Sequence, residues 1–136
     1  MRDGVRQELK ALARHRLARA REAFAEGDHL LVMGAARGAT NRFYYAAFFA
    51  ARALLATREV DSSKHSGVIA LFQRHFVKVG HFDVETGRTL ARAFEKRQKT
   101  DYADFATITI EEARLVRGEV ETFVRECELA LERQGA

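Results

Sequence analysis

The stretch from Phe43 to Leu55 constrains the fold most, because its side chains are apolar on nearly every side of a helix. Aromatic, alanine and leucine residues fill this stretch, and Arg52 is its one charged residue. A helix without a polar face is normally buried on all sides, either centrally in a bundle or partly against a second subunit. A chain of 136 residues can hardly surround such a helix alone, so we predict a homodimer.

The first half of the chain is predicted to be helical almost throughout. The sequence contains no proline, so nothing in it prevents long helices. Apolar residues at three- and four-residue spacing predict a first helix that ends at Gly27. Asp28 can cap a weak segment after it, and a strong helix is predicted from about Thr40 to Thr57.

Three more helices are predicted in the second half. The first runs over about 66–78 and is closed by Gly80, and the second runs over about 83–98 from a cap at Asp83. A polar stretch follows over 99–107, which would end the second of these helices. Thr109 and Glu112 then form a capping-box pattern for the last helix, which extends to about Arg133. We therefore predict an all-α fold, an up-and-down bundle of about five helices, in a single domain over residues 1–136.

The charge pattern and the cysteine content bear on partners and location. The formal net charge is +4, with basic residues crowding the first helix and acidic residues the last. These two helices are predicted to lie near each other and complement one another, or to be simply solvated, and an RNA-binding face is the alternative. Cys127 is the single cysteine, the N-terminus lacks an apolar signal core, and no apolar run is long enough to span a membrane. We expect a soluble, cytoplasmic protein.

Three groups of residues could carry chemistry. The first is Asn41-Arg42-x-Tyr44-Tyr45, followed by Arg52, on or beside the apolar helix; it predicts a ligand-anion site or a polar network between helices. The second is Ser62-Ser63-Lys64-His65-Ser66-Gly67, which predicts an anion pocket or ordinary capping by Ser63 or Ser66. The third is Arg97-Gln98-Lys99-Thr100-Asp101-Tyr102 at the predicted helix end. It predicts either convergence on a ligand or an Arg97–Asp101 ion pair.

Several common site patterns are absent from the sequence. It has no Gly-rich phosphate loop, no paired-cysteine zinc pattern and no His-Glu-x-x-His helix. The five histidines are scattered without metal-ligand spacing. We therefore expect neither a metal nor a cofactor.

Taken together and in this order, the three groups resemble the HEPN domain family, in its small bacterial and archaeal form. The resemblance spans about Leu17 to Leu131. The residues that carry it are Asn41-Arg42-x-Tyr44-Tyr45-Ala46-x-Phe48-x-Ala50-Ala51-Arg52-Ala53-Leu54-Leu55, Ser63-Lys64-His65-Ser66-Gly67, Phe76-Val77-Lys78-x-Gly80 and Ala93-Phe94-x-x-Arg97-x-x-x-Asp101-Tyr102.

The resemblance implies a dimerising helical bundle, often encoded beside a minimal nucleotidyltransferase as a toxin–antitoxin pair. Many members of the family are metal-independent ribonucleases with an Arg-x4–6-His motif, in which an imidazole exchanges a proton and the arginine stabilises phosphorane charge. Here Tyr102 stands at the shortest spacing after Arg97, and no histidine follows within range. Tyrosine, with a pKa of about 10, is a poor base at neutral pH.

These features lead to two main hypotheses. In the first, the protein is a nucleotide-binding or toxin–antitoxin component that acts with a minimal nucleotidyltransferase. Phosphate would be bound by Arg42, Tyr45, Lys64, His65 and Ser66, and Tyr102 would accept AMP. In the second, the protein is an RNA-cleaving toxin in which Arg97, Asp101 and Tyr102 line a composite site across two subunits, and burial of Asp101 makes it the base. A structural adaptor with purely packing arginines is a third reading.

Overall fold

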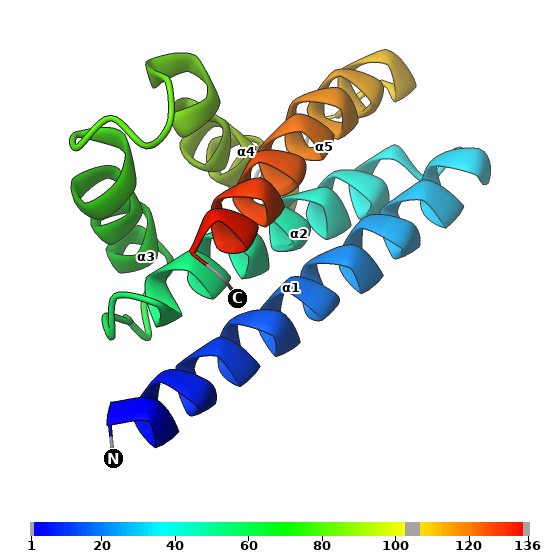
Figure 1. Ribbon diagram of the computed structural model, residues 1–136. Coiled ribbons are helices and arrows are strands. Elements are labelled where there is room, and N and C mark those ends of the chain that lie inside the picture. The colour runs from blue at the N-terminus through cyan, green and yellow to red at the C-terminus, as the bar shows by residue number, and fades with distance from the viewer. Residues whose placement is uncertain (1, 103–106, 135–136) are drawn as a thin grey trace.

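The computed structural model describes residues 2–102 and 107–134, with side chains described for 6–99, 101 and 107–134. The described residues form five α-helices and one short π-helix, and contain no strand (Figure 1). The helices are α1 (Arg2–Val32), α2 (Ala36–Ala56), α3 (His65–Phe72), the π-helix η1 (Gln73–Val77), α4 (Val84–Tyr102) and α5 (Ile110–Arg133). The predicted all-α bundle of about five helices is confirmed.

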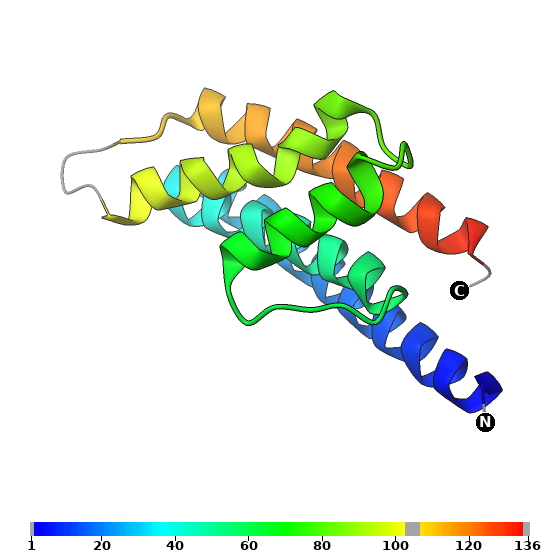
Figure 2. The ribbon, with the colours of Figure 1, turned by 90° about the vertical axis from the view of Figure 1, so that its left-hand side faces the viewer.

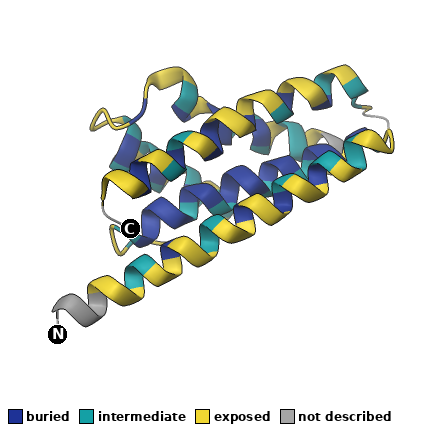
Figure 3. Ribbon diagram, turned by 45° about the vertical axis from the view of Figure 1, so that its right-hand side comes forward, coloured by how far each residue is buried: buried dark blue, intermediate teal, exposed yellow. Residues whose placement is uncertain are grey.

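Helix α2 forms the centre of the bundle. It contacts α1, α3, α4 and α5, and 14 of its 21 residues are buried. Figure 3 shows this helix as a largely buried rod beneath helices that expose one face each. The prediction that α2 is buried is confirmed, but its burial is achieved mostly within one chain. The expectation that one chain could not surround α2 is therefore wrong. The homodimer itself stays a prediction, and a second copy could cover the half-buried strip of α2 at Tyr45 and Phe49.

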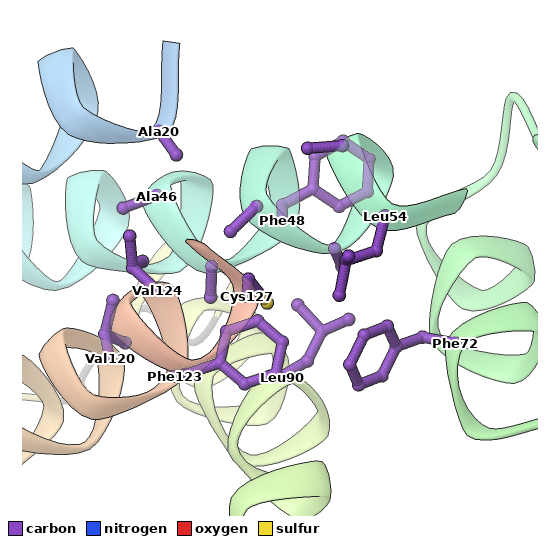
Figure 4. Close-up of a cluster of buried hydrophobic side chains, with 14 of the residues drawn as sticks. Ala20, Ala46, Phe48, Leu54, Phe72, Leu90, Val120, Phe123, Val124 and Cys127 are labelled. Atoms are coloured by element: carbon purple, nitrogen blue, oxygen red, sulfur yellow. The ribbon is translucent and has the colours of Figure 1, made fainter. Parts of the chain in front are cut away.

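The core between α2 and the second half of the chain is aromatic and aliphatic. Phe72 packs its ring against those of Phe82 and Phe123, with centroids 5.2 and 5.3 Å apart. Leu54, Leu90 and the buried Cys127 complete the contact between α2, α4 and α5 (Figure 4). Each large apolar side chain buried in this way contributes about 1.5–3 kcal/mol to folding.

The end of the first helix was predicted wrongly. Helix α1 continues through Gly27 to Val32, and Gly34, at φ 80°, supplies the left-handed residue that ends it. A β-carbon on Gly27 would lie 2.5 Å from the ring of Phe43, so this glycine permits close approach of α1 and α2. Asp28 is not a cap either. Its carboxylate accepts hydrogen bonds from Arg117 on α5 at 2.5 and 3.1 Å.

Other boundaries follow the predictions more closely. Thr109 and Glu112 form the predicted capping box at the start of α5. Asp83 accepts a hydrogen bond from the backbone amide of Thr86, and Gly80, at φ 86°, closes the turn after η1. Helix α2 begins at Ala36, four residues before the predicted start, and no side chain caps it.

The predicted complementarity of the first and last helices is present in the fold. Arg21 on α1 pairs with Glu128 on α5, and Arg117 on α5 pairs with Asp28 on α1. No described helix is long and apolar enough to cross a membrane.

The connection from α2 to α3 positions the candidate site. It returns along the bundle before α3 begins, as Figure 2 shows. His65 thereby lies beside Tyr44, although Tyr44 is three turns, about 18 Å, before the end of α2. The connecting residues 58–64 can span up to about 24 Å when extended, so they cover this distance.

Candidate functional site

Arg97 and Asp101 lie one turn apart near the end of α4. Arg97 Nε is 3.1 Å from Asp101 Oδ2, and the two side chains are 16% and 24% exposed. The ion pair considered from the sequence is therefore present. The predicted helix end at Gln98 is wrong, because α4 continues to Tyr102. Arg97 and Asp101 share one face of an intact helix, since residues four apart are neighbours on a helix surface.

Two tyrosine rings of α2 form a wall against Arg97. The guanidinium carbon lies 5.4 Å from the ring centroid of Tyr44 and 5.2 Å from that of Tyr45. Attraction between a cation and an aromatic face contributes about 0.5–2 kcal/mol, and more as water is excluded. The role of Tyr44 and Tyr45 is thus to bind the guanidinium of Arg97, which lies far away in the chain on α4.

Asn41 and Arg42 extend the cluster at the start of α2. Asn41 Oδ1 accepts hydrogen bonds from Arg42 Nε at 3.3 Å and Nη2 at 3.0 Å, while Asn41 Nδ2 lies 3.5 Å from Asp101 Oδ2. Arg42 also covers the ring of Tyr45 at 4.9 Å and pairs with Glu26 on α1 at 3.5 Å. Side chains from α1, α2 and α4 are therefore linked at one place.

His65 enters the same cluster from the start of α3. Its Nδ1 is 2.5 Å from the hydroxyl of Tyr44, and its ring stacks on Phe48 with centroids 4.5 Å apart. Burial and then the positive charges of Arg97 and Arg52 lower the pKa of His65 below its ordinary value. Burial raises the pKa of Tyr44, and this effect outweighs the opposing charge of Arg97. At neutral pH the site thus holds a neutral imidazole and a neutral phenol beside a guanidinium.

The other predicted site residues, Lys64, Ser66 and Tyr102, are not joined to the cluster by any described contact. Lys64 and Ser66 are exposed. Lys64 is the N-cap residue of α3 without a side-chain cap bond, so the predicted capping by Ser63 or Ser66 is wrong. The hydroxyl of Ser62 instead accepts from the Lys64 amide at 3.2 Å. Tyr102 ends α4, and its side chain lies outside the described residues.

Arg52 serves the fold rather than the cluster. Its guanidinium donates to Asp61 at 2.8 and 3.2 Å, and Arg16 on α1 donates to the same carboxylate at 3.0 Å. Arg16 also donates to the backbone oxygen of Arg52 at 3.0 Å. The polar network considered for the arginine within α2 is confirmed. It fastens the middle of the α2–α3 connection, at Asp61.

Tyr44 was named from the sequence within the first group but without a role of its own, and Asp61 was missed. Tyr44 lies among apolar neighbours in the chain and is fully buried, so only its hydroxyl distinguished it from a core residue. Asp61 is an acidic residue in a polar connection. Arg52 in the apolar helix before it needs a carboxylate partner, and this need could have pointed to Asp61.

The cluster has a definite chemical character. Arg97 and Arg42 supply cations, His65 supplies a neutral imidazole, and tyrosine rings supply an apolar wall. Guanidinium groups recognise phosphate through paired N–H donors, and aromatic rings stack on bases. Asp101 lies within the same group and restrains Arg97.

Known relatives share long stretches of this sequence. The protein named "Putative toxin MJ0605" of Methanocaldococcus jannaschii is 35% identical over 127 residues, which cover 93% of this chain and 91% of that protein. A "UPF0332 protein" of Thermotoga maritima is 43% identical over 86 residues, 63% of this chain and 65% of its own length. "Putative toxin MJ0142" of M. jannaschii is 40% identical over 75 residues, 55% of this chain and 51% of its own length. The match thus spans less than two thirds of the last two proteins.

A family model covers most of the chain. The model of the HEPN domain matches residues 13–130, which include all five α-helices in whole or in part and every described residue of the cluster. The resemblance stated from the residues is therefore confirmed, and the chain belongs to the HEPN domain family.

Proposed function

We propose that this protein is a toxin-system component that binds the phosphate of a nucleotide or RNA at the Arg97–His65 cluster. One observation carries the proposal. Helices α3 and α4 bring His65 and Arg97 to the same buried tyrosine of α2, Tyr44. The guanidinium carbon of Arg97 lies 5.4 Å from the ring centroid of Tyr44, and His65 Nδ1 lies 2.5 Å from its hydroxyl. A guanidinium and an imidazole beside aromatic rings match a phosphate ester chemically, because they supply N–H donors and the rings supply a stacking surface.

The names of two relatives support the setting of a toxin system. Both proteins of M. jannaschii carry the word toxin in their names, and one of them matches nearly the whole chain. The partner in our proposal is a minimal nucleotidyltransferase, as the family resemblance implies.

Phosphate binding is tested by titrating labelled AMP and a short single-stranded RNA into the purified protein. We expect Arg97→Gln to weaken binding about tenfold or more, because a charge-assisted contact contributes about 1.5–3 kcal/mol. Arg92→Gln is the matched control: Arg92 lies on the same helix but pairs with Glu85 and Glu119. Equal affinities of the two variants, with unchanged helical circular dichroism, would contradict the proposal.

Modification by the partner is a second part of the proposal. Tyr102 follows Asp101 directly and lies five residues after Arg97, so it is close to the cluster in the chain. Intact-mass and peptide spectrometry after co-expression with a minimal nucleotidyltransferase tests the assignment. We expect one AMP per chain, lost in Tyr102→Phe and kept in Tyr45→Phe. An unmodified Tyr102 with an active transferase would exclude it.

RNA cleavage is the second candidate function, and one observation favours it. No histidine follows Arg97 at the spacing of the family motif, but His65 on α3 lies close enough to Arg97 for that charge to act on its imidazole. His65 also contacts Phe94, which lies on the same helix as Arg97. The purified protein would be incubated with RNA beside Arg97→Ala and His65→Ala variants. Cleavage lost in both variants supports this function; no cleavage, or equal cleavage by all three, rejects it.

The homodimer belongs to the same proposal. Tyr45 and Phe49 are half-buried on α2, and the guanidinium groups of Arg42 and Arg19 lie over their rings at 4.9 and 4.7 Å. A second copy could cover this strip, and aromatic and arginine side chains are enriched at protein interfaces.

A further inference from the structure

The contact between Tyr44 and His65 joins a fully buried side chain to a half-buried one. Tyr44 is 0% exposed and belongs to α2, whereas His65 is the first residue of α3. Tyr44 Oη lies 2.5 Å from His65 Nδ1, so the two groups share a hydrogen bond. Phe48 stacks on one face of the imidazole at 4.5 Å, so the ring has little freedom to rotate.

The direction of this hydrogen bond follows from the proton inventory of the two groups. A tyrosine hydroxyl carries one proton, and a neutral imidazole carries one proton on either Nδ1 or Nε2. If Nδ1 carried it, Nδ1–H would donate to Tyr44, and the buried phenolic proton would have no acceptor among the described residues. An unsatisfied buried donor costs about 1–3 kcal/mol. If Tyr44 donates to Nδ1, every proton in the pair is used, and the imidazole proton moves to Nε2.

The charged groups around the imidazole act in the same direction. Arg52 of α2 and Arg97 of α4 oppose a second proton on the ring, and Lys64 precedes it in the chain. The tyrosines that face the ring, Tyr44 and Tyr45, are not carboxylates that could stabilise an imidazolium. The opposite ring edge, Nε2, makes no hydrogen bond within residues 6–99, 101 and 107–134, and it is not a fully buried unpaired atom.

We propose that Tyr44 is a positioning residue that fixes His65 in the neutral Nε2–H tautomer, so that the site offers an uncharged N–H donor to a phosphate oxygen beside the cationic Arg97. This inference rests on the proposed phosphate-binding function and deepens it. An imidazole in this state can donate to an anion, but it has no lone pair on Nε2 with which to accept a proton. The geometry therefore favours binding of a phosphate ester over a role of His65 as general base at its free edge.

The tautomer can be measured directly. In protein labelled with 15N at histidine, the ring nitrogen shifts distinguish a protonated from an unprotonated nitrogen, and a His65→Gln variant assigns the signal among the five histidines. At neutral pH we expect His65 to carry its proton on Nε2. A proton on Nδ1 would overturn the inference.

Tyr44→Phe tests the positioning role, because it keeps the buried ring and removes only the hydroxyl. We expect the two His65 tautomers to become mixed and the pKa of His65 to change, while Tyr45→Phe leaves the His65 nitrogen shifts as they are. If Tyr44→Phe leaves the tautomer unchanged in a folded protein, Tyr44 does not position His65 and the inference fails. Helical circular dichroism and amide spectra establish that the variant is folded.

Binding of AMP separates this inference from the proposed function. Tyr44→Phe should weaken AMP binding about three- to tenfold, the effect of one misplaced hydrogen bond. If the wild-type protein shows the Nε2–H tautomer but binds no AMP, the proposed function fails and the tautomer assignment stands. If AMP binds tightly and His65 carries its proton on Nδ1, the proposed function stands and the present inference fails.

Discussion

Asp61 joins α1, α2 and the connection after α2 through one carboxylate. Burial alone would raise its pKa, but hydrogen bonds from Arg52 and the amide of Ser62, with the charges of Arg52 and Arg16, lower the pKa to about 2 from the ordinary 3.8. The folded state therefore favours the ionised form. The stability gained in this way is complete above about pH 4 and is lost as the pH falls through the folded pKa.

Asp61→Asn should accordingly destabilise the protein at pH 7, and the loss in the free energy of unfolding should become smaller as the pH falls. We expect a loss of about 1 kcal/mol at pH 7, a modest value because the Asp61 side chain is 42% exposed to solvent. Urea unfolding at pH 7, 5 and 3 measures the difference between the two proteins. Glu22→Gln, at an exposed site on α1, is the control; a pH-independent penalty for Asp61→Asn would contradict the assignment.

Gly27 shows how a single atom can decide a helix contact. An alanine there would place Cβ 2.5 Å from the Phe43 ring, whereas Cβ at Gly118 on α5 would meet nothing within 4 Å. Gly27→Ala should cost about 1–3 kcal/mol through overpacking, despite the better helix propensity of alanine. Gly118→Ala should stabilise by up to about 1 kcal/mol. Thermal unfolding of both variants measures the two effects. If both substitutions shift the melting temperature equally and in the same direction, the special role of Gly27 is refuted.

At the scale of elements, the capping box of α5 illustrates what local sequence can specify. Glu112 donates its amide to Thr109 Oγ1 at 3.1 Å, and its carboxylate accepts from the Thr109 amide at 3.3 Å. Lys96 on α4 also donates to Glu112 at 3.0 Å, so the cap is tied to a neighbouring helix. All the residues of the box lie within four positions, which is why the pattern could be read from the chain.

Thr109→Ala should therefore cost about 1 kcal/mol, the usual effect of a lost N-cap. Chemical denaturation measures the total, and amide hydrogen exchange should be faster in the first turn of α5. Thr122→Ala is a suitable control, because Thr122 lies within the same helix and its hydroxyl donates only to the backbone oxygen of Gly118. A loss as large in the control as in Thr109→Ala would show that the cap is not responsible.

Helix ends that depend on packing could not be predicted in this way. Gly27 looked like a terminator, because glycine ends many helices, yet the α1–α2 contact requires it inside the helix. Similarly, the polar residues 99–102 gave no sign that α4 continues. The Arg97–Asp101 ion pair lies in this last part of α4.

At the scale of the whole molecule, the proposed homodimer covers the half-buried strip of α2 that contains Tyr45 and Phe49. Phe49→Glu should convert the proposed homodimer into a folded monomer, since a buried carboxylate at an interface is costly and Arg19 can pair with it in the free subunit. Sedimentation velocity at micromolar concentration measures the change. Leu115→Glu, at a side chain 70% exposed on α5, should leave the dimer intact. A wild-type protein that sediments as a strict monomer would exclude the homodimer.

The sequence by itself determined the helical class, the burial of α2, the capping of α5 and the family, because these depend on local periodicity and on residues close in the chain. It also identified Arg42, Tyr45, His65, Arg97 and Asp101 as candidates. Only the tertiary structure decided that they meet, since α4 contributes two of them and a returning connection brings His65 back to Tyr44. The same contact gave Tyr44 its role: a hydroxyl buried in an apolar helix acquires a function only from the partner that reaches it, and that partner lies 21 residues away in the chain.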